Sequence, residues 1–182
     1  MQHVNLSLYT NTRYSPGKPL NRMVWYFIDM IFFKTLLPFP SGFKMSLLRF
    51  FGSKIGTGVV IKPNVHIKYP WFLTIGDHCW IGEGVWIDNL AQVTIGANVC
   101  LSQGSYLLTG SHDYKKNTFD LITRPITVEE GTWIGAKAIV CPGVTCHNHS
   151  VLAVGSVAVS NLEAYGIYQG NPAVKKRKRA IE

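Results

Sequence analysis

One histidine of this sequence lies in a run of small and polar residues. His112 ends the run Thr109-Gly110-Ser111-His112 and is followed by Asp113. A neutral imidazole, with an ordinary pKa of ~6.5, can take a proton from a hydroxyl group at neutral pH and release it later in the reaction. In extended backbone the side chain of Asp113 points away from that of His112. His112 is therefore the candidate general base, and the other histidines are expected to serve structure or surface.

The elements that must position His112 are indicated by an internal repeat. A large residue, aliphatic in all but one case, recurs in runs at six-residue steps: Ile55, Ile61, Ile75, Ile81, Ile87, Ile95, Leu101, Val128, Ile134, Val140, Cys146 and Leu152. The residue four places after each of them is small or β-branched. Residues i and i+4 of a strand share a face, so each step sends one large and one small side chain into a narrow interior. An α-helix would need a period of 3.6, so the repeat predicts an all-β stack of short parallel strands.

Short strands of this kind need tight connections, and the composition supplies them. Only 15% of the residues are charged, while the chain holds 17 glycines and 9 prolines. Glycine directly follows the large residue at several steps: Gly56, Gly76, Gly82, Gly96 and Gly135. A turn or a close approach of two backbones is the usual reason for glycine at such a place.

The repeat is interrupted once, and His112 lies in the interruption. The period fails between Leu107 and Val128. A regular stack accommodates such an insertion only as an external loop, and long loops in compact domains are often functional. The sequence therefore predicts an inserted loop, residues 111–125, that carries the active site.

Two stretches of the sequence carry a family resemblance. The segment from Lys54-Ile55-Gly56 to Tyr69-Pro70-Trp71 and the run Thr109-Gly110-Ser111-His112-Asp113 resemble the hexapeptide-repeat acyltransferases. They are most similar to the colanic acid biosynthesis acetyltransferase branch, which is related to the maltose and galactoside O-acetyltransferases. The resemblance implies a left-handed parallel β-helix, in which three six-residue sides make one coil of a triangular prism.

The resemblance also implies an activity. It implies an O-acetyltransferase that moves acetyl from acetyl-CoA to a sugar hydroxyl in exopolysaccharide or cell-surface glycan biosynthesis, with His112 as general base and no metal. The acceptor would be a small sugar or a lipid-linked glycan. Active sites would lie between the prisms of a homotrimer, with Trp80, Trp86 and Trp133 as candidate contacts. N-acetyl transfer to an amino sugar and O-acetyl transfer to serine stay open as alternatives.

Residues for the acetyl donor come from the same resemblance. They are Gly135, Ala136, Gly155, Ser156, Asn171, Pro172 and Arg177. The first four match the wall along which the family lays the pantetheine arm of CoA. The asparagine and proline match the loop beside its adenine end, and the arginine aligns with a contact to a CoA phosphate.

A partner for His112 is less well defined by the sequence. The asparagine that sugar O-acetyltransferases place on the preceding coil has no match. Glu83, Asp88 and Asn89 lie in that region and are candidates to orient His112 or to bind the acceptor. Each of them also suits a solvated turn.

Positive charge is concentrated at the two ends of the chain. The net charge is +8, with seven basic residues and one acid in residues 1–54, six against eight in residues 55–174, and five against one in residues 175–182. The repeats are therefore not a nucleic-acid surface. We divide the chain into an extension (residues 1–52), a β-helix domain (residues 53–174) and a basic tail that begins at residue 175.

The extension is expected to hold one or two short helices. Asn21 is a candidate N-cap of the first, and Ser41 begins a second that ends at Gly52. Both apolar runs are shorter than the ~18–20 residues needed to cross a bilayer. Two roles stay open for them: they cap the open end of the prism, or they dock on a membrane surface.

The cysteines and histidines suggest no metal or disulfide framework. Four cysteines form no CxxC pair, and no signal-peptide pattern opens the sequence. We expect reduced thiols in a cytoplasmic protein, with the inner face of the membrane as a second location. His78 and His112 have roughly the spacing of two zinc ligands in γ-carbonic anhydrases, but Asn117 stands where the third would fall. A zinc hydratase and a non-catalytic scaffold are the rival interpretations.

Overall fold

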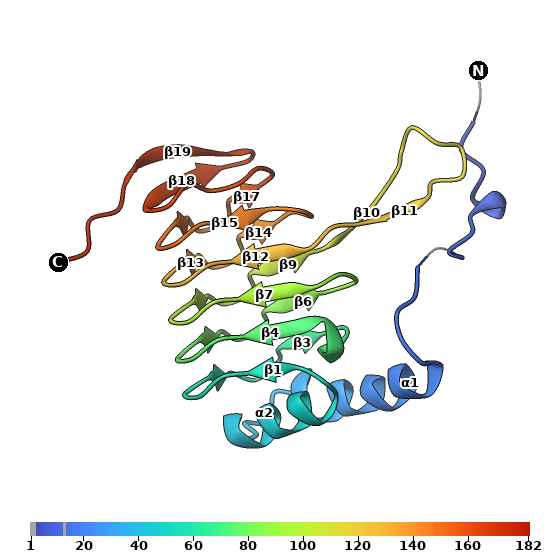
Figure 1. The fold of residues 1–182 in the computed structure, drawn as a ribbon, viewed down its shortest axis with the longest axis horizontal. Helices are drawn as coiled ribbons and strands as arrows, with labels where there is room; N and C mark the ends of the chain where they lie inside the picture. The colour runs from blue at the N-terminus through green and yellow to red at the C-terminus, as the bar shows by residue number, and fades with distance from the viewer. Residues whose placement is uncertain (1–2, 13) are drawn as a thin grey trace.

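Each coil of the computed structural model, which describes residues 3–12 and 14–182, adds one short strand to each of three sheets (Figure 1). Sheet A is the parallel series β1 (Lys54–Ile55), β4 (Leu73–Ile75), β7 (Val93–Ile95), β12 (Ile126–Val128) and β15 (Thr145–Cys146). Sheet B holds β2 (Val60–Ile61), β5 (Trp80–Ile81), β8 (Cys100–Leu101), β13 (Trp133–Ile134), β16 (Val151–Leu152), β18 (Gly166–Gly170) and β19 (Ala173–Lys178). Sheet C holds β3 (His66–Ile67), β6 (Trp86–Asp88), β9 (Tyr106–Leu108), β14 (Ile139–Val140) and β17 (Val157–Ala158).

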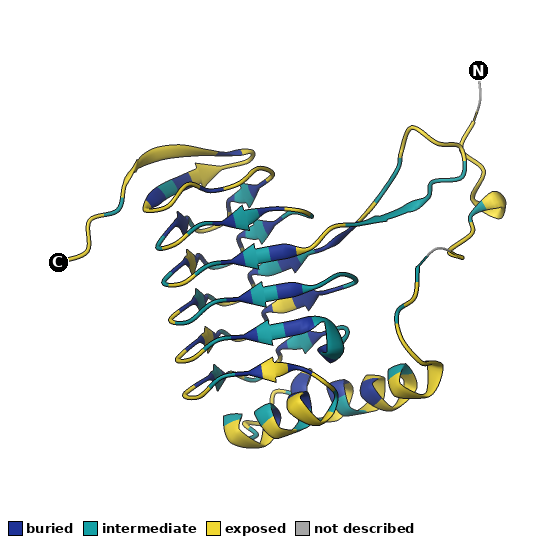
Figure 2. Cartoon of the chain, in the orientation of Figure 1, coloured by how far each residue is buried: buried dark blue, intermediate teal, exposed yellow. Residues whose placement is uncertain are grey.

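The predicted repeat forms the interior of the prism. In sheet A, Ile55 pairs with Ile75, and Ile75 pairs with Ile95, so equivalent large residues lie directly above one another. All of the large repeat residues are buried, and Figure 2 shows buried positions recurring along the strands of every coil. The all-β prism expected from the sequence is therefore confirmed, and its core is one continuous column.

The glycines of the repeat allow adjacent coils to approach closely. A Cβ atom at Gly76, Gly96 or Gly135 would lie 2.7 Å from a backbone nitrogen of the next coil. Positive φ angles occur later in each turn, at residues such as Asn98 and Lys137. Of the two reasons expected for these glycines, close backbone approach is the one that applies.

Helices cover the N-terminal end of the prism. They are α1 (Pro19–Ile28), the π-helical η2 (Asp29–Phe33) and α2 (Ser41–Phe50). The expected N-cap at Asn21 is wrong, because Pro19 already occupies the first turn and Lys18 precedes it. Proline suits that position because its missing N–H has no partner there in any case.

The helices satisfy backbone groups that the first coil would otherwise leave open. Trp25 Nε1 donates to the Ile67 carbonyl oxygen at 2.8 Å, and Lys44 Nζ donates to the Lys62 carbonyl oxygen at 2.9 Å. Burial lowers the pKa of Lys44. An open edge of this kind would invite pairing with another chain. The inner side of the helical segment therefore caps the prism, one of the two roles expected from the sequence.

The insertion is a projecting strand pair. β10 (Gly110–His112) and β11 (Leu121–Thr123) form an antiparallel hairpin that extends away from the prism (Figure 1). The N-terminal arm, residues 3–12 and 14–17 with the short η1 (Leu6–Leu8), runs beside it, and the Asn5 N–H donates to the Asn117 carbonyl oxygen at 2.8 Å. The predicted loop is thus a hairpin held by a distant part of the chain.

The other end of the prism is closed by β18 and β19. These strands pair antiparallel, so the basic segment expected as a tail begins as the strand β19. Arg179 Nη1 then donates to the Gly131 and His149 carbonyl oxygens at 2.9 and 3.2 Å. Within residues 3–12 and 14–182, no helix is long and apolar enough to pass through a membrane.

Candidate active site

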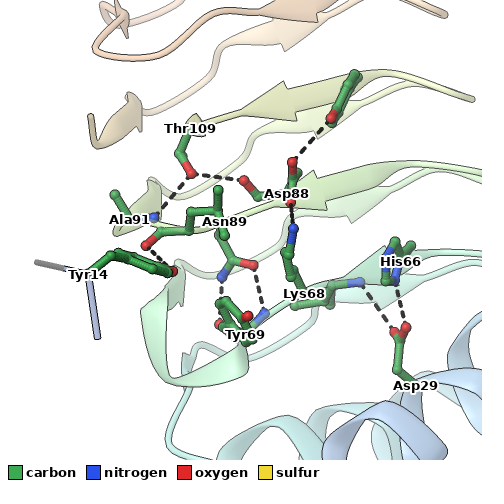
Figure 3. A network of polar contacts seen from close by, with 12 residues as sticks. Tyr14, Asp29, His66, Lys68, Tyr69, Asp88, Asn89, Ala91 and Thr109 are labelled. Atoms are coloured by element: carbon green, nitrogen blue, oxygen red, sulfur yellow. Dashed lines mark hydrogen bonds and ion pairs between the residues drawn. The ribbon is translucent and has the colours of Figure 1, made fainter. Parts of the chain in front are cut away.

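The base of the hairpin is fixed to the coil beneath it. Thr109 Oγ1 donates to the Asp88 carbonyl oxygen at 2.8 Å and accepts from the Ala91 N–H at 3.1 Å (Figure 3). Gly110 follows in a place where a Cβ atom would collide with Leu90. These contacts set the direction in which β10 leaves sheet C and so determine where His112 is held.

The His112 ring lies between two aromatic side chains. It stacks on Phe119 with ring centroids 4.4 Å apart and an interplanar angle of 8°. Tyr9 of the N-terminal arm approaches at 6.0 Å with the rings tilted by 56°. The imidazole is only partly exposed. Its orientation is therefore determined by the hairpin and by the arm together.

The hydrogen bond of His112 defines its tautomer. Nδ1 lies 2.8 Å from the carbonyl oxygen of Phe119. A carbonyl oxygen only accepts, so Nδ1 carries the proton and Nε2 keeps its lone pair. Phe119 has a φ of +51°, in the left-handed region that bulky residues rarely adopt. The turn thus holds a sparsely populated backbone conformation next to the candidate base, as functional sites often do.

The arm and the hairpin enclose a pocket of about 450 Å³. Its wall includes Thr10 and Tyr14 from the arm and Asp113 and Leu121 from the hairpin. Leu121 is the strand partner of His112. Tyr14 also ties the arm to the prism, because its hydroxyl donates to the Leu90 carbonyl oxygen at 2.8 Å and burial raises its pKa. The pocket therefore adjoins the hairpin that carries His112, and Asp113, the residue after His112, is part of its wall.

The three candidate partners of His112 lie in different places. Asp88 ends β6 directly under the hairpin base. Asn89 is fully buried, and its side-chain amide bonds the backbone of Tyr69 and Phe72, so here it holds the chain. Glu83 is exposed in the turn after β5, at a different corner of the prism. Of the three, Asp88 is the one beside the hairpin base, because it pairs with Leu108 at the end of β9, the strand that leads to the hairpin.

Asp88 belongs to a polar and aromatic ladder on sheet C (Figure 3). Lys68 Nζ lies 2.9 Å from its carboxylate, and the Tyr106 hydroxyl donates to it at 3.3 Å. Burial, with the nearby Asp88 charge as a smaller cause, raises the pKa of Tyr106 to about 12. Trp86 stacks on Tyr106 with ring centroids 4.7 Å apart. The ladder therefore places aromatic rings and charged side chains next to the hairpin, where a bound molecule could contact them.

The donor residues expected from the resemblance gather at one corner. The Gly155 N–H donates to the Ala136 carbonyl oxygen at 2.9 Å, so the turns after β13 and β16 are stacked. Ser156 Oγ accepts from the Gly170 N–H at 3.0 Å, which brings the turn that contains Asn171 and Pro172 to the same corner. Gly135 and Ser156 are buried at this corner, whereas Ala136 is partly exposed and Gly155 is exposed, so the last two are the ones that a pantetheine arm could reach.

Arg177 lies apart from that turn. It is exposed on β19 opposite Ile167, four residues beyond Ala173, the first residue of the strand after the turn. Its neighbour Lys175 pairs with Glu163 at 2.6 Å, and the side-chain hydrogen bond from Glu163 raises the pKa of Lys175. Strand β19 therefore carries a row of cations that leads away from the donor corner.

A zinc site receives no support from the geometry. His78 lies in the turn between β4 and β5, whereas His112 lies on the hairpin after β9. Within the part of the chain that the structure describes, no group of three His, Cys, Asp or Glu side chains is placed to hold a metal ion.

Two residues around His112 were not anticipated from the sequence. Phe119 is separated from His112 by the hairpin tip, and Tyr9 is separated from it by about a hundred residues. Neither position belongs to the six-residue repeat. An aromatic residue a few places after a candidate histidine is only a weak sign of a ring contact. The sequence of the arm gives no sign that Tyr9 would reach His112.

Comparison with known proteins adds the last observations. No protein-family model matches the chain. WcaF of Escherichia coli (strain K12), which bears the name of a colanic acid biosynthesis acetyltransferase, is 39% identical over 163 residues and 90% of each chain. The galactoside O-acetyltransferase of Escherichia coli (strain K12) is 28% identical over 131 residues, 70% of this chain and 64% of that protein. The structure of a hexapeptide-repeat acetyltransferase of Vibrio cholerae in complex with acetyl-CoA matches with a TM-score of 0.78 at 26% identity, over 87% of both chains.

Proposed function

This chain belongs to the hexapeptide-repeat acetyltransferases and is an acetyl-CoA-dependent acyltransferase, and from that premise we propose that it acetylates a sugar hydroxyl with His112 as general base. The prism is the left-handed parallel β-helix of that family. The acceptor that we propose is a sugar unit of an exopolysaccharide or cell-surface glycan, either free or linked to a lipid. The likeness to WcaF and to a galactoside O-acetyltransferase supports a sugar over serine.

The orientation of the His112 ring carries the proposal. Because Nδ1 donates to the Phe119 carbonyl oxygen, the basic nitrogen is Nε2, which has no hydrogen-bond partner among the described residues. Nε2 takes the proton of the acceptor hydroxyl as its oxygen attacks the thioester carbonyl carbon. The C–S bond then breaks, and the imidazolium returns the proton to the leaving thiolate. The ring ends in its starting state, so one histidine serves both half-steps.

The other parts of the site are proposed on the same basis. Gly135, Ala136, Gly155 and Ser156 line the pantetheine arm, and the turn at Asn171 and Pro172 meets the adenine end. Arg177 contacts a phosphate of CoA. Asp88 binds the acceptor or orients it near His112, whereas the contacts of Asn89 and the position of Glu83 favour structural roles for these two.

We also propose that the active protein is a homotrimer. Trp80 and Trp133 stand on the outer surface of sheet B and Trp86 on that of sheet C, and all three rings are exposed. Large exposed aromatic residues on flat sheets are typical of subunit contacts. The hairpin extends away from its own prism, so a neighbouring prism would complete the site (Figure 1). Light scattering on Trp80→Ser should show a smaller assembly than the native protein.

Thiol release from acetyl-CoA tests the chemistry. We expect release to depend on an acceptor from a panel of nucleotide sugars and oligosaccharides, and to fall by ~10²-fold or more in His112→Ala. His78→Asn is the matched control, because asparagine tolerates the positive φ of that turn and should leave the rate unchanged. Release that survives in His112→Ala contradicts the role of the base, and a preference for amino sugars would favour N-acetyl transfer.

A further inference from the structure

The outer side of the helical end carries an unusual pattern. α1 and η2 turn one face toward the prism, and that face includes the charged residues Arg22 and Asp29. The opposite face is a stripe of exposed apolar side chains at spacings of three and four: Leu20, Met23, Val24, Phe27 and Ile31. We call this set the apolar stripe. The inward face also buries Trp25 and Phe33 in the core, so the helical segment is apolar on both sides. A second, exposed apolar face indicates a surface that another molecule or a membrane covers.

Exposure is large along the whole stripe. Leu20 is 64% exposed, Phe27 is 52% exposed and Ile31 is 50% exposed. The apolar character continues after the helix, since Leu36 and Leu37 are also exposed. Neither capping of the prism nor the acetyl-transfer site uses these side chains. They contribute nothing to the core, and their presence on the surface has no explanation within one chain.

The charge of this end is one-sided. In the described part of residues 3–54, the sole acidic residue is Asp29, which is buried and lies 2.6 Å from His66 Nδ1 and 3.7 Å from Lys34 Nζ. The exposed charges there are cations, and Lys18 and Lys34 stand just before and just after the helices that carry the stripe. An apolar stripe with cations at its two ends and no exposed carboxylate complements an anionic lipid surface.

A basic pocket lies behind the stripe. Arg22, Lys34 and Lys68 line a space of about 300 Å³ between α1 and sheet C, together with the buried carboxylate of Asp29, which lies 3.7 Å from Lys34 Nζ. Arg22 Nε is buried and has no hydrogen-bond partner among the described residues. A buried donor of this kind has an unmet requirement that an anionic group would satisfy. Because Lys34 pairs with Asp29 and Lys68 pairs with Asp88, Arg22 is the cation of this pocket that is left for a phosphate group.

We propose that the apolar stripe docks this acetyltransferase on an anionic phospholipid bilayer. α1 lies in the plane of the lipid headgroups, the stripe enters the acyl boundary, and Lys18 and Lys34 meet lipid phosphates. A second copy of the chain is a poorer occupant, because a two-fold contact through this face would bring the cations of both copies together. Docking does not depend on the proposed sugar chemistry, since it can be measured without acetyl transfer.

Vesicle sedimentation of the full-length protein tests the proposal. We expect binding to vesicles of phosphatidylcholine mixed with phosphatidylglycerol and little binding to phosphatidylcholine alone. The double variant Phe27→Asp, Ile31→Asp should bind about tenfold more weakly or worse, because its apolar surface is lost. Val159→Asp is the matched control, since it places the same charge on an exposed valine at the other end of the prism.

The electrostatic part has its own variants. Lys18→Gln and Lys34→Gln should each weaken binding about fivefold, and added salt should reduce the difference. Lys18, Phe27 and Ile31 are exposed, so the melting temperature of their variants should stay unchanged and a folding defect cannot imitate the result. Lys34→Gln also removes the pair with buried Asp29, so its melting temperature is measured alongside and Lys18→Gln carries the electrostatic test. The proposal is overturned if the native protein does not bind the anionic vesicles, or if the double variant binds them as well as the native protein. It also fails if the double variant changes the size of the assembly, because the stripe would then be a contact between copies.

Discussion

The prism and the β10–β11 hairpin are stabilised in different ways. Ile81 and Ile87 in the prism are enclosed by equivalent residues of the coils above and below. In the hairpin, Gly110 is buried, but the side chains of β11 are only partly buried, and the N-terminal arm supplies the remaining support. Stability therefore resides in a structure that repeats, and the proposed chemistry resides in the segment that breaks the repeat. Substitutions in the two regions should affect different measurements.

The largest expected effect on stability is in the prism. Ile81→Ala removes a fully buried side chain from the central column and should lower the free energy of unfolding by about 2–5 kcal/mol. The matched substitution Ile122→Ala, on the partly buried strand β11, should cost about 1 kcal/mol or less. Chemical denaturation measures both. Equal losses would mean that the hairpin is as integral to the fold as the prism, and the comparison would fail.

The junction between the two regions should respond in both measurements. Thr109→Val keeps the shape of the side chain but removes the hydroxyl that joins the Asp88 carbonyl oxygen to the Ala91 N–H. The Asp88 carbonyl oxygen keeps its backbone donors, but the Ala91 N–H loses its partner. A polar group left without a partner costs about 1–3 kcal/mol, and the hairpin should leave sheet C in an altered direction. We therefore expect a lower melting temperature together with a lower kcat. A variant with reduced stability and native kcat would show that this link does not position His112.

Within the hairpin, Phe119 should affect rate without affecting stability. Phe119→Gly removes the ring that stacks on His112 but suits the positive φ at this position. A loosely held base should lower kcat/KM by about tenfold. Phe119→Tyr keeps the stacked ring and serves as the control. If glycine at this position retains the full rate, the stack is not what holds the imidazole.

The contact from the arm should have a smaller effect. Tyr9→Ala removes a tilted ring contact worth about 0.5–1.5 kcal/mol, so kcat/KM should fall by roughly threefold to tenfold. Leu8→Ala is the control, because Leu8 is exposed in the same arm. Steady-state kinetics with acetyl-CoA and the best acceptor measure both variants. A larger loss in Leu8→Ala would indicate that the arm acts through its overall position and not through Tyr9.

The difference between the repeating prism and the hairpin also explains which features could be predicted from the sequence. The prism was predictable because each six-residue side repeats one constraint, and a pattern such as Ile75, Ile81, Ile87 records it many times over. The support of His112 was not predictable, because Phe119 and Tyr9 each act once and through distant contacts. Glu83 and Asp88 are close in sequence and were both candidate partners of His112. They lie at opposite ends of one side of the prism, so closeness in sequence did not mean closeness to His112.

The reactivity of the cysteine thiols should differ least among these measurements, but it reports on single positions within the prism. Burial, with the charge of Glu129 as a second cause, raises the pKa of Cys146 to about 12, and burial also raises that of Cys79. At mildly alkaline pH both residues should hold fewer thiolates than the same cysteines in the unfolded chain, so they should resist alkylation until the prism opens. Cys100, which is half-exposed on sheet B, should react first. Mass spectrometry after brief alkylation measures the order in which the cysteines are labelled. Early labelling of Cys146 would mean that the coils separate locally, and the prism would then not be the rigid part of the molecule.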